Sequence, residues 1–205
     1  AALAKLNQVG ERLSKHDTRL AVLQDKQAVL ALLGTLHANA LRRQEQARYD
    51  VAALLRYRCL ELIGQQRLAE YGILSERPNF DRFGAGRSAL EQRYRQVQKS
   101  VGRKQCYPLP ERAFGLFVGY MLLKALEDEL VHDLSIGMIE ARSAARNTSM
   151  LTHGFRLIDQ VEYESFCEVV EQVLERYLQL VCVSRADWET TFRFVAIDVL
   201  TNPEE

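Results

Sequence analysis

The chain has 205 residues, of which 47% are hydrophobic and 26% are charged, a composition ordinary for a globular domain. No run approaches eighteen apolar residues, and the N-terminus lacks the parts of a signal peptide, so the sequence argues against a membrane or secreted protein and predicts a cytoplasmic one. The formal net charge of zero excludes a chain that is strongly basic or acidic as a whole.

The first 37 residues divide into a polar start and a helical segment. Residues 1–10 are polar and alanine-rich, whereas residues 11–37 carry leucines at close to helical spacing, with Gly34 weakening the end of that helix. We expect residues 1–37 to form an N-terminal helical arm or a linker from a longer chain, and residues 38–205 to form the main domain.

Residues 38–71 predict two helices that pair as a hairpin. Tyr49-Asp50 marks a break or a capped start between them. The apolar stripe of the second helix consists of Val51, Leu54, Leu55, Arg58, Leu62 and Ile63. The pair has the form of one tetratricopeptide hairpin, but no second copy follows at a period of about 34 residues, so no repeat array is predicted.

Proline and glycine among polar residues predict a loop over residues 73–88. A basic helix is expected over residues 88–101, where Ser88 and Glu91 have the spacing of a capping box. A further helix is expected over residues 111–133. Its expected core residues are Phe114, Phe117, Val118, Met121, Leu122 and Leu126.

The last third predicts a strongly amphipathic helix over residues 163–183 and a short closing helix over residues 187–200. The first has eight apolar residues on one side and four glutamates on the other. No segment alternates apolar and polar residues for long enough to indicate a strand. The predicted fold is therefore all-α, a bundle of about six to eight helices.

Charge is divided unevenly along the chain. Residues 82–104 hold seven basic residues and one acid, whereas residues 159–205 hold eleven acids and three arginines. The planar guanidinium group suits phosphate, so Arg87, Arg93 and Arg95 are candidate RNA contacts. A solvated surface of salt bridges explains the same pattern equally well.

Cysteine and histidine are too scattered to indicate a metal site. The four cysteines lie 47, 61 and 15 residues apart, with no CxxC pair, and the four histidines are also dispersed. We expect buried free thiols, no metal and no other cofactor.

Residues 146–154 are the most informative stretch of the chain, because they combine an arginine, an asparagine and a histidine before a glycine. On a helix, Arg146 and His153 are about two turns apart and project from one face. A histidine can exchange a proton with the ribose 2′-hydroxyl or the leaving 5′-oxygen, while an arginine holds the phosphate oxygens. Asn147 could position the phosphate or orient His153.

Plainer explanations of these residues stay open. An arginine and a histidine seven residues apart occur by chance in many helices, and Asn147 with the two residues after it could be a helix N-cap. His132 stands beside Asp133 without a partner arginine and is interpreted as structural. Arg142, one turn before Arg146, could contact RNA or pair with Glu140 or Glu162.

Arg146-Asn147 followed by His153-Gly154, in an all-α chain, resembles the R-x4-6-H signature of the HEPN ribonuclease superfamily. Residues 39–62, from Asn39-Ala40-Leu41 through Tyr49-Asp50 to Glu61-Leu62, resemble the first helices of HEPN domains in ancillary ribonucleases of type III CRISPR systems. The segment Arg67-Leu68-Ala69-Glu70-Tyr71-Gly72-Ile73 continues the likeness. The resemblance covers residues 38 to about 183.

The resemblance implies a helical bundle that pairs as a homodimer, so that two copies of the motif meet in one composite cleft. It implies metal-independent cleavage that leaves a 2′,3′-cyclic phosphate and a 5′-hydroxyl, with Arg146, Asn147 and His153 as site residues. Residues 38–205 would then be a HEPN-like ribonuclease domain. The family's usual regulator is a CARF domain that senses cyclic oligoadenylate, and because nothing here has βαβ character, such a domain is implied only for a parent chain.

The leading hypothesis is therefore a dimeric endoribonuclease acting on single-stranded RNA in antiviral defence. The second is a non-catalytic HEPN module that binds RNA or dimerises. The third is an interaction scaffold built on the hairpin of residues 38–71.

Overall fold

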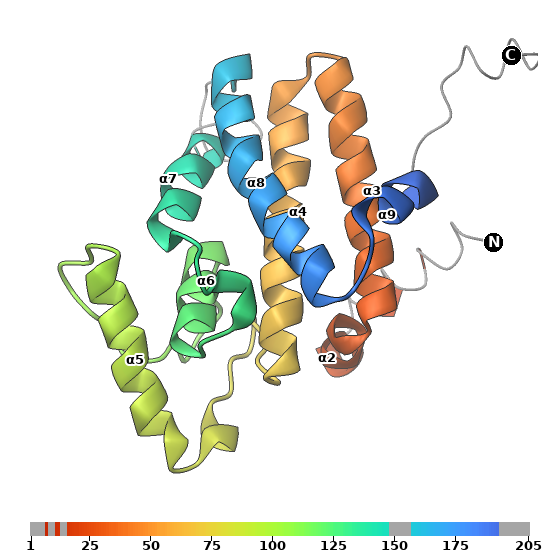
Figure 1. Cartoon of the computed structure of the whole chain (residues 1–205). Helices are drawn as coiled ribbons and strands as arrows, with labels where there is room; N and C mark the ends of the chain where they lie inside the picture. The colour runs from red at the N-terminus through yellow and green to blue at the C-terminus, as the bar shows by residue number, and fades with distance from the viewer. Residues whose placement is uncertain (1–6, 8–10, 13–15, 148–156, 193–205) are drawn as a thin grey trace, which may run out of the picture.

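The computed structural model describes residues 7, 11–12, 16–147 and 157–192, in which the chain forms eight α-helices, two short 3₁₀ helices and no strand (Figure 1). The α-helices are α2 (His16–Gln24), α3 (Lys26–Glu45), α4 (Tyr49–Glu70), α5 (Gly86–Ser100), α6 (Leu116–Ala125), α7 (Ile136–Asn147), α8 (Gln160–Leu180) and α9 (Arg185–Phe192). The 3₁₀ helices are η1 (Asp81–Phe83) and η2 (Glu129–Val131). The all-α prediction is confirmed.

Helix α4 is the central element of the bundle. It packs against α3 and α8 along its length and against α2, α6 and α7 elsewhere, while α5 lies outermost against α6 and α9 crosses α3 (Figure 1). Among the described residues, Tyr120, Tyr163 and Tyr177 are the largest fully buried side chains of the core between these helices. Each buries more apolar surface than a leucine does and so stabilises the bundle more.

Helix α8 follows the predicted amphipathic pattern. It spans residues 160–180, where 163–183 was expected, and begins with a capping box between Asp159 and Glu162. Its buried side includes seven of the eight predicted apolar residues, namely Phe166, Val169, Val170, Val173, Leu174, Tyr177 and Leu178. Val181 is half-buried beyond the end of the helix.

The expected boundary at residue 37 falls inside α3, which runs without a break from Lys26 to Glu45. Its residues on both sides of that boundary, such as Leu33 and Ala40, are completely buried. Gly34 lies against the ring of Phe192 in α9, so close that a Cβ at this position would be 2.2 Å from the ring. The glycine therefore serves helix packing rather than ending the helix.

Three sequence expectations were wrong in detail. The helix expected over residues 111–133 is only α6, followed by the separate turn η2. Of its expected core residues, Met121 and Leu122 are buried, and the other four are half-buried against the core. Helix α5 starts at Gly86, before Ser88, and no side chain caps it. The four cysteines are free, but of them only Cys59 is buried.

In the described part of the chain, five helices end in the same hydrogen-bonded turn, in which the chain adopts a positive φ angle just beyond the helix. After α4 and α5 the residue in this position is Gly72 or Gly102, but after α3, α6 and α8 it is Ala47, Glu127 or Cys182. At the end of α3, for example, the amide of Arg48 donates to the carbonyl of Arg43 at 2.8 Å. These turns are Schellman motifs, three of them without the glycine that suits the position best.

Candidate functional site

Arg146 and Asn147 are the last two described residues of α7, and their side chains lie outside the description. His153 and the rest of residues 148–156 lie outside the described residues altogether. The expectation that Arg146 and His153 share one helix face therefore stays a prediction.

The preceding turns of α7 pack into the bundle. Ile136, Ile139 and Ser143 are buried, and the helix contacts α4, α6 and α8. Position 146 follows Ser143 by three residues and Ile139 by seven, so it is in register with this inward row. The arginine of the motif thus stands at a helix position continuous with the core side of α7.

The C-terminal end of α7 lies at the same end of the bundle as the start of α8 and the turn between α3 and α4 (Figure 1). The hydroxyl of Tyr163 in α8 donates to Oε1 of Gln44 at 3.0 Å, and its ring centroid is 5.5 Å from that of Tyr49. We call this end, formed by residues 41–50 and 157–163, the turn end.

The turn end exposes both cationic and apolar side chains. Arg42 and Arg48 are exposed, while three large apolar side chains stand in solvent on the same end: Leu41, Leu157 and Val161, with relative exposures of 39%, 61% and 75%. Leu157 and Val161 are four residues apart at the start of α8. Exposed cationic and apolar side chains thus share this end of the bundle.

Both carboxylates proposed as alternative partners of Arg142 have other partners. Glu140 forms an ion pair with Arg103, and Glu162 closes the capping box of α8. The side chain of Arg142 itself is outside the description.

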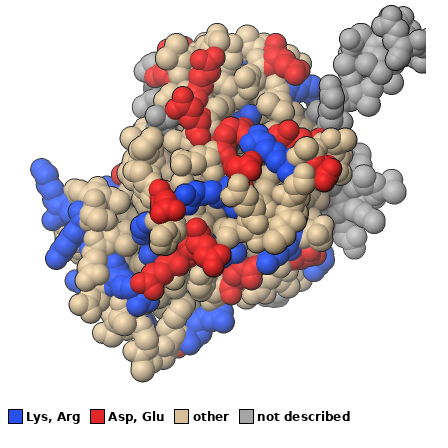
Figure 2. Space-filling view, viewed as in Figure 1, with Lys and Arg blue, Asp and Glu red and all other residues tan. Residues whose placement is uncertain are grey.

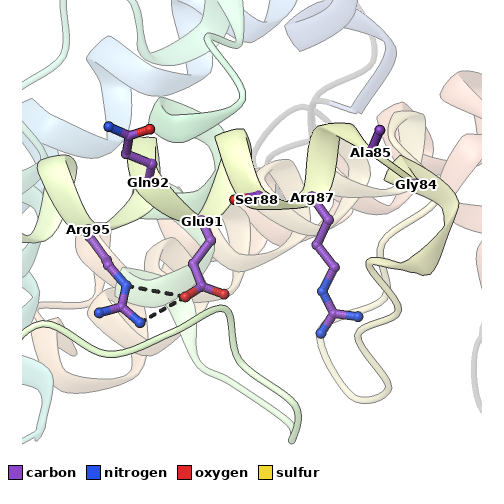
Figure 3. A pocket seen from close by; sticks show the side chains of 7 residues that line it. All are labelled: Gly84, Ala85, Arg87, Ser88, Glu91, Gln92 and Arg95. Carbon is purple, nitrogen blue, oxygen red and sulfur yellow. Dashed lines mark hydrogen bonds and ion pairs between the residues drawn. The ribbon is translucent and has the colours of Figure 1, made fainter.

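The three arginines predicted to contact RNA from α5 do not act alike. Arg87 forms an ion pair with Asp81 at 2.7 Å, and Arg95 forms one with Glu91 at 2.8 Å. Both arginines line an open groove of about 740 Å³ along residues 84–95 (Figure 3). Arg93 points inward, where its Nε donates to the carbonyl of Ala125 at 2.7 Å and so satisfies the end of α6. The structure gives Arg93 a helix-capping role.

A buried ionic cluster that the sequence did not indicate lies deeper in the bundle. The guanidinium group of Arg56, only 3% exposed, donates to Glu171, which also accepts from Arg185, and Nε2 of His37 is 3.4 Å from the same carboxylate. Burial by itself raises the pKa of Glu171, but His37 and the two guanidinium groups outweigh it and hold that pKa at about 2. The cluster joins α3, α4, α8 and α9.

The sequence did not indicate Arg56 because the expected apolar stripe of α4 put Arg58, and not Arg56, on the inward side of the helix. Between residues 51 and 63, the buried residues are Ala52, Ala53, Arg56, Tyr57, Cys59, Leu60, Leu62 and Ile63, whereas Arg58 is exposed. Counting the alanines as apolar would have placed Arg56, not Arg58, on the inward side.

The other candidate groups show no assembled site. His132 is exposed, with Nδ1 at 2.9 Å from Asp133. Within residues 16–147 and 157–192, histidine, cysteine and acidic side chains form no group of three that could hold a metal ion. No helix in the described part of the chain is long and apolar enough to cross a membrane.

The sequence model of one family, the Csm6 HEPN domain, matches residues 21–177, which are 157 of the 205 residues. The chain belongs to the Csm6 HEPN domain family. No curated protein matches it. The matched part of this HEPN domain runs from α2 into α8 and includes the stretch from Arg146 to Gly154. It also begins seventeen residues before the boundary expected at residue 38.

Proposed function

We propose that this HEPN domain is a metal-independent endoribonuclease that cuts single-stranded RNA. One observation carries the proposal: the Csm6 HEPN match spans residues 146–154, where the chain reads Arg-x6-His. The helical fold and the position of Arg146 at the end of α7, next to an exposed surface of mixed character, support it.

In the proposed reaction, His153 removes the proton from the ribose 2′-hydroxyl, whose oxygen attacks the adjacent phosphorus. Arg146 binds the non-bridging oxygens as negative charge accumulates on them, and Asn147 positions the phosphate or the imidazole. The bond to the 5′-oxygen then breaks, and that oxygen takes up a proton. The products are a 2′,3′-cyclic phosphate and a 5′-hydroxyl, and no step needs a metal ion or redox cofactor.

The active site is composite in this proposal. One chain supplies one arginine and one histidine, and a second copy related by two-fold symmetry supplies the other pair. The exposed Leu157 and Val161, at the end of the bundle where α7 ends, fit the apolar part of such an interface.

The biological setting is proposed from the family alone. A HEPN domain of the Csm6 kind would act in type III CRISPR antiviral defence, in the cytoplasm. A CARF domain of the parent chain would activate it on binding cyclic oligoadenylate.

The test is cleavage of a labelled single-stranded RNA in EDTA. We expect the wild type to cut, and Arg146→Ala and His153→Ala each to lose at least about a hundredfold in rate, since each removes a main catalytic group. Thermal unfolding should stay unchanged. Arg58→Ala and His132→Ala, at exposed positions, are matched controls that should keep full activity.

Two results would contradict the proposal. Full cleavage by both motif variants would place the activity elsewhere. RNA binding without any product, from the wild type, would instead identify a non-catalytic HEPN module.

A further inference from the structure

The outer face of α5 carries a row of polar side chains that the domain itself does not use. Ser88, Gln92, Gln96 and Lys99 are exposed and follow one another at intervals of three or four residues, so they share one side of the helix. None of these four side chains makes a hydrogen bond or ion pair with another part of the chain that the structure describes. We call these four residues the α5 row.

The inward face of α5 explains why the row is rigidly held. Leu90 and Tyr94 are buried, and the buried Gln98 binds both the amide and the carbonyl of Tyr107, at 2.9 and 2.8 Å. Arg93 anchors the same helix to the end of α6. The α5 row is therefore presented on a fixed helix rather than on a mobile loop.

The chemistry of this face fits a nucleic-acid strand. Glu91 is the one acid in α5, and its charge is paired with Arg95. Arg87, Glu91 and Arg95 project together beside the row, with Gln92 turned away from them (Figure 3). Serine, glutamine and lysine bind phosphate oxygens, sugar hydroxyls and base edges without demanding one sequence.

The surface around the row is cationic as well. Lys and Arg side chains predominate over α5 and the loop after it, whereas Asp and Glu gather over α8 (Figure 2). The exposed residues of α5 include no large apolar side chain. A membrane or an apolar protein partner would need such side chains, so these observations favour RNA over both.

The length of the row matches a short stretch of RNA. Eleven residues separate Ser88 from Lys99, which is about 16 Å along a helix. A stacked strand advances about 3.4 Å per nucleotide, so the row spans about five nucleotides.

The N-terminal half of the row is distant from the motif. The start of α5, where Ser88 lies, is at the opposite end of the molecule from the C-terminal end of α7 (Figure 1). The other end of the row comes closer, because Arg103, just beyond Lys99, forms an ion pair with Glu140 of α7. Nucleotides that contact Ser88 and Gln92 are therefore not the two that flank the scissile bond.

We propose that the α5 row is a secondary binding site for the single-stranded RNA substrate, holding nucleotides remote from the cleaved phosphodiester. This inference rests on the proposed ribonuclease function and extends it, because it predicts that the enzyme prefers long RNA. A substrate that is too short to reach the row gains nothing from it.

The test uses the double variant Gln92→Glu, Gln96→Glu in the full chain. Each change keeps the size and shape of the side chain but adds a negative charge at an exposed position without internal partners. The matched control is Gln27→Glu, Gln172→Glu, which adds the same charges at exposed positions on α3 and α8.

Cleavage of a 20-nucleotide and a 6-nucleotide RNA is measured, with anisotropy of the labelled 20-mer as a separate readout of binding. We expect the α5 variant to raise KM for the 20-mer by about tenfold at low salt, with kcat unchanged, and to leave the 6-mer unaffected. The control should behave as the wild type.

The outcomes separate the two proposals. An unchanged KM and an unchanged affinity for the 20-mer overturn the α5 site even if the enzyme cuts RNA. If the wild type cuts no RNA, the proposed ribonuclease function is wrong. In that case, loss of 20-mer binding by the α5 variant but not by the control variant would still support the α5 row as an RNA-binding site.

Discussion

Glu171 is the residue on which the buried ionic cluster depends, because it is the acidic partner of Arg56. It also pairs with Arg185, whose guanidinium group has further acidic partners in Glu175 and Glu189. Removing its charge leaves the Arg56 guanidinium, 3% exposed, without a counter-ion in the interior. An unpaired buried charge is far more costly than the pair itself is stabilising.

We therefore predict that Glu171→Gln lowers the free energy of unfolding by about 3–5 kcal/mol. Urea denaturation at pH 7 measures the change. Glu164→Gln, at an exposed position on the same helix, is the matched control and should change stability by less than about 0.5 kcal/mol. Equal effects of the two variants would show that the cluster contributes no special stability.

The pH dependence of this effect has a definite sign. The folded-state pKa of Glu171 is about 2, below its ordinary value of 4.5, so its charge stabilises the fold fully above pH 4.5. That contribution is lost as pH falls towards 2. The gap in unfolding free energy between the wild type and Glu171→Gln should be largest above pH 4.5 and shrink steadily below it. A gap that stays constant from pH 6 to pH 2 would contradict the assignment.

Single residues were the hardest part of the molecule to predict from sequence. The sequence singles out the motif residues because their chemistry is distinctive at any position, and their role stays a prediction, whereas the structural roles of Arg67 and Arg93 could not be predicted. Arg93 caps α6 through a carbonyl 32 residues away, and Arg67 binds the buried Asp128 with two nitrogens. Such partners come together only in the folded chain, so local patterns carry no sign of them.

The Schellman turns are the feature of the helices most open to improvement. Ala47 and Cys182 hold φ angles of 54° and 57°, a conformation that costs a residue with a Cβ roughly 1 kcal/mol more than glycine. Both residues are exposed, so their side chains contribute little packing.

We predict that Ala47→Gly and Cys182→Gly each stabilise the domain by up to about 1 kcal/mol, which corresponds to a rise in Tm of about 2–4 °C. Gln179→Gly, inside the last turn of α8, is the control and should instead lower Tm, because glycine destabilises a helix interior. Differential scanning calorimetry distinguishes the two directions. A lower Tm for both turn variants would refute the strain at these positions.

Helices whose limits depend on neighbouring residues were predicted well, whereas helices whose limits depend on contacts with distant parts of the chain were not. Helix α8 was predicted to within three residues because its apolar side repeats over five turns. The helix expected over residues 111–133 was too long at both ends. It begins only after Gly115 and ends at Ala125, where the chain turns with a positive φ angle at Glu127 before Asp128, held by Arg67, caps η2. At α5, Ser88 and Glu91 have the spacing of a capping box, but the helix already begins at Gly86, two residues before Ser88.

For the whole molecule, the proposed ribonuclease predicts that one cut requires the motifs of two chains. The exposed apolar residues of the turn end and the single motif per chain both favour a shared site. Mixing wild type with the inert double variant Arg146→Ala, His153→Ala, in equal amounts and with free exchange of chains, measures this number.

If both motifs of a dimer are needed, only dimers of two wild-type chains cut, and activity falls to about a quarter of that of the unmixed enzyme. If each motif acts by itself, activity falls only to about half. Adding Val161→Glu to the inert chain supplies the control, because a charge on the exposed apolar surface should keep that chain out of wild-type dimers and return the value to about half. If the mixture without Val161→Glu keeps about half of the activity, the composite site is excluded. If the mixture in which the inert chain carries Val161→Glu still falls to about a quarter, the dimer interface lies away from the turn end.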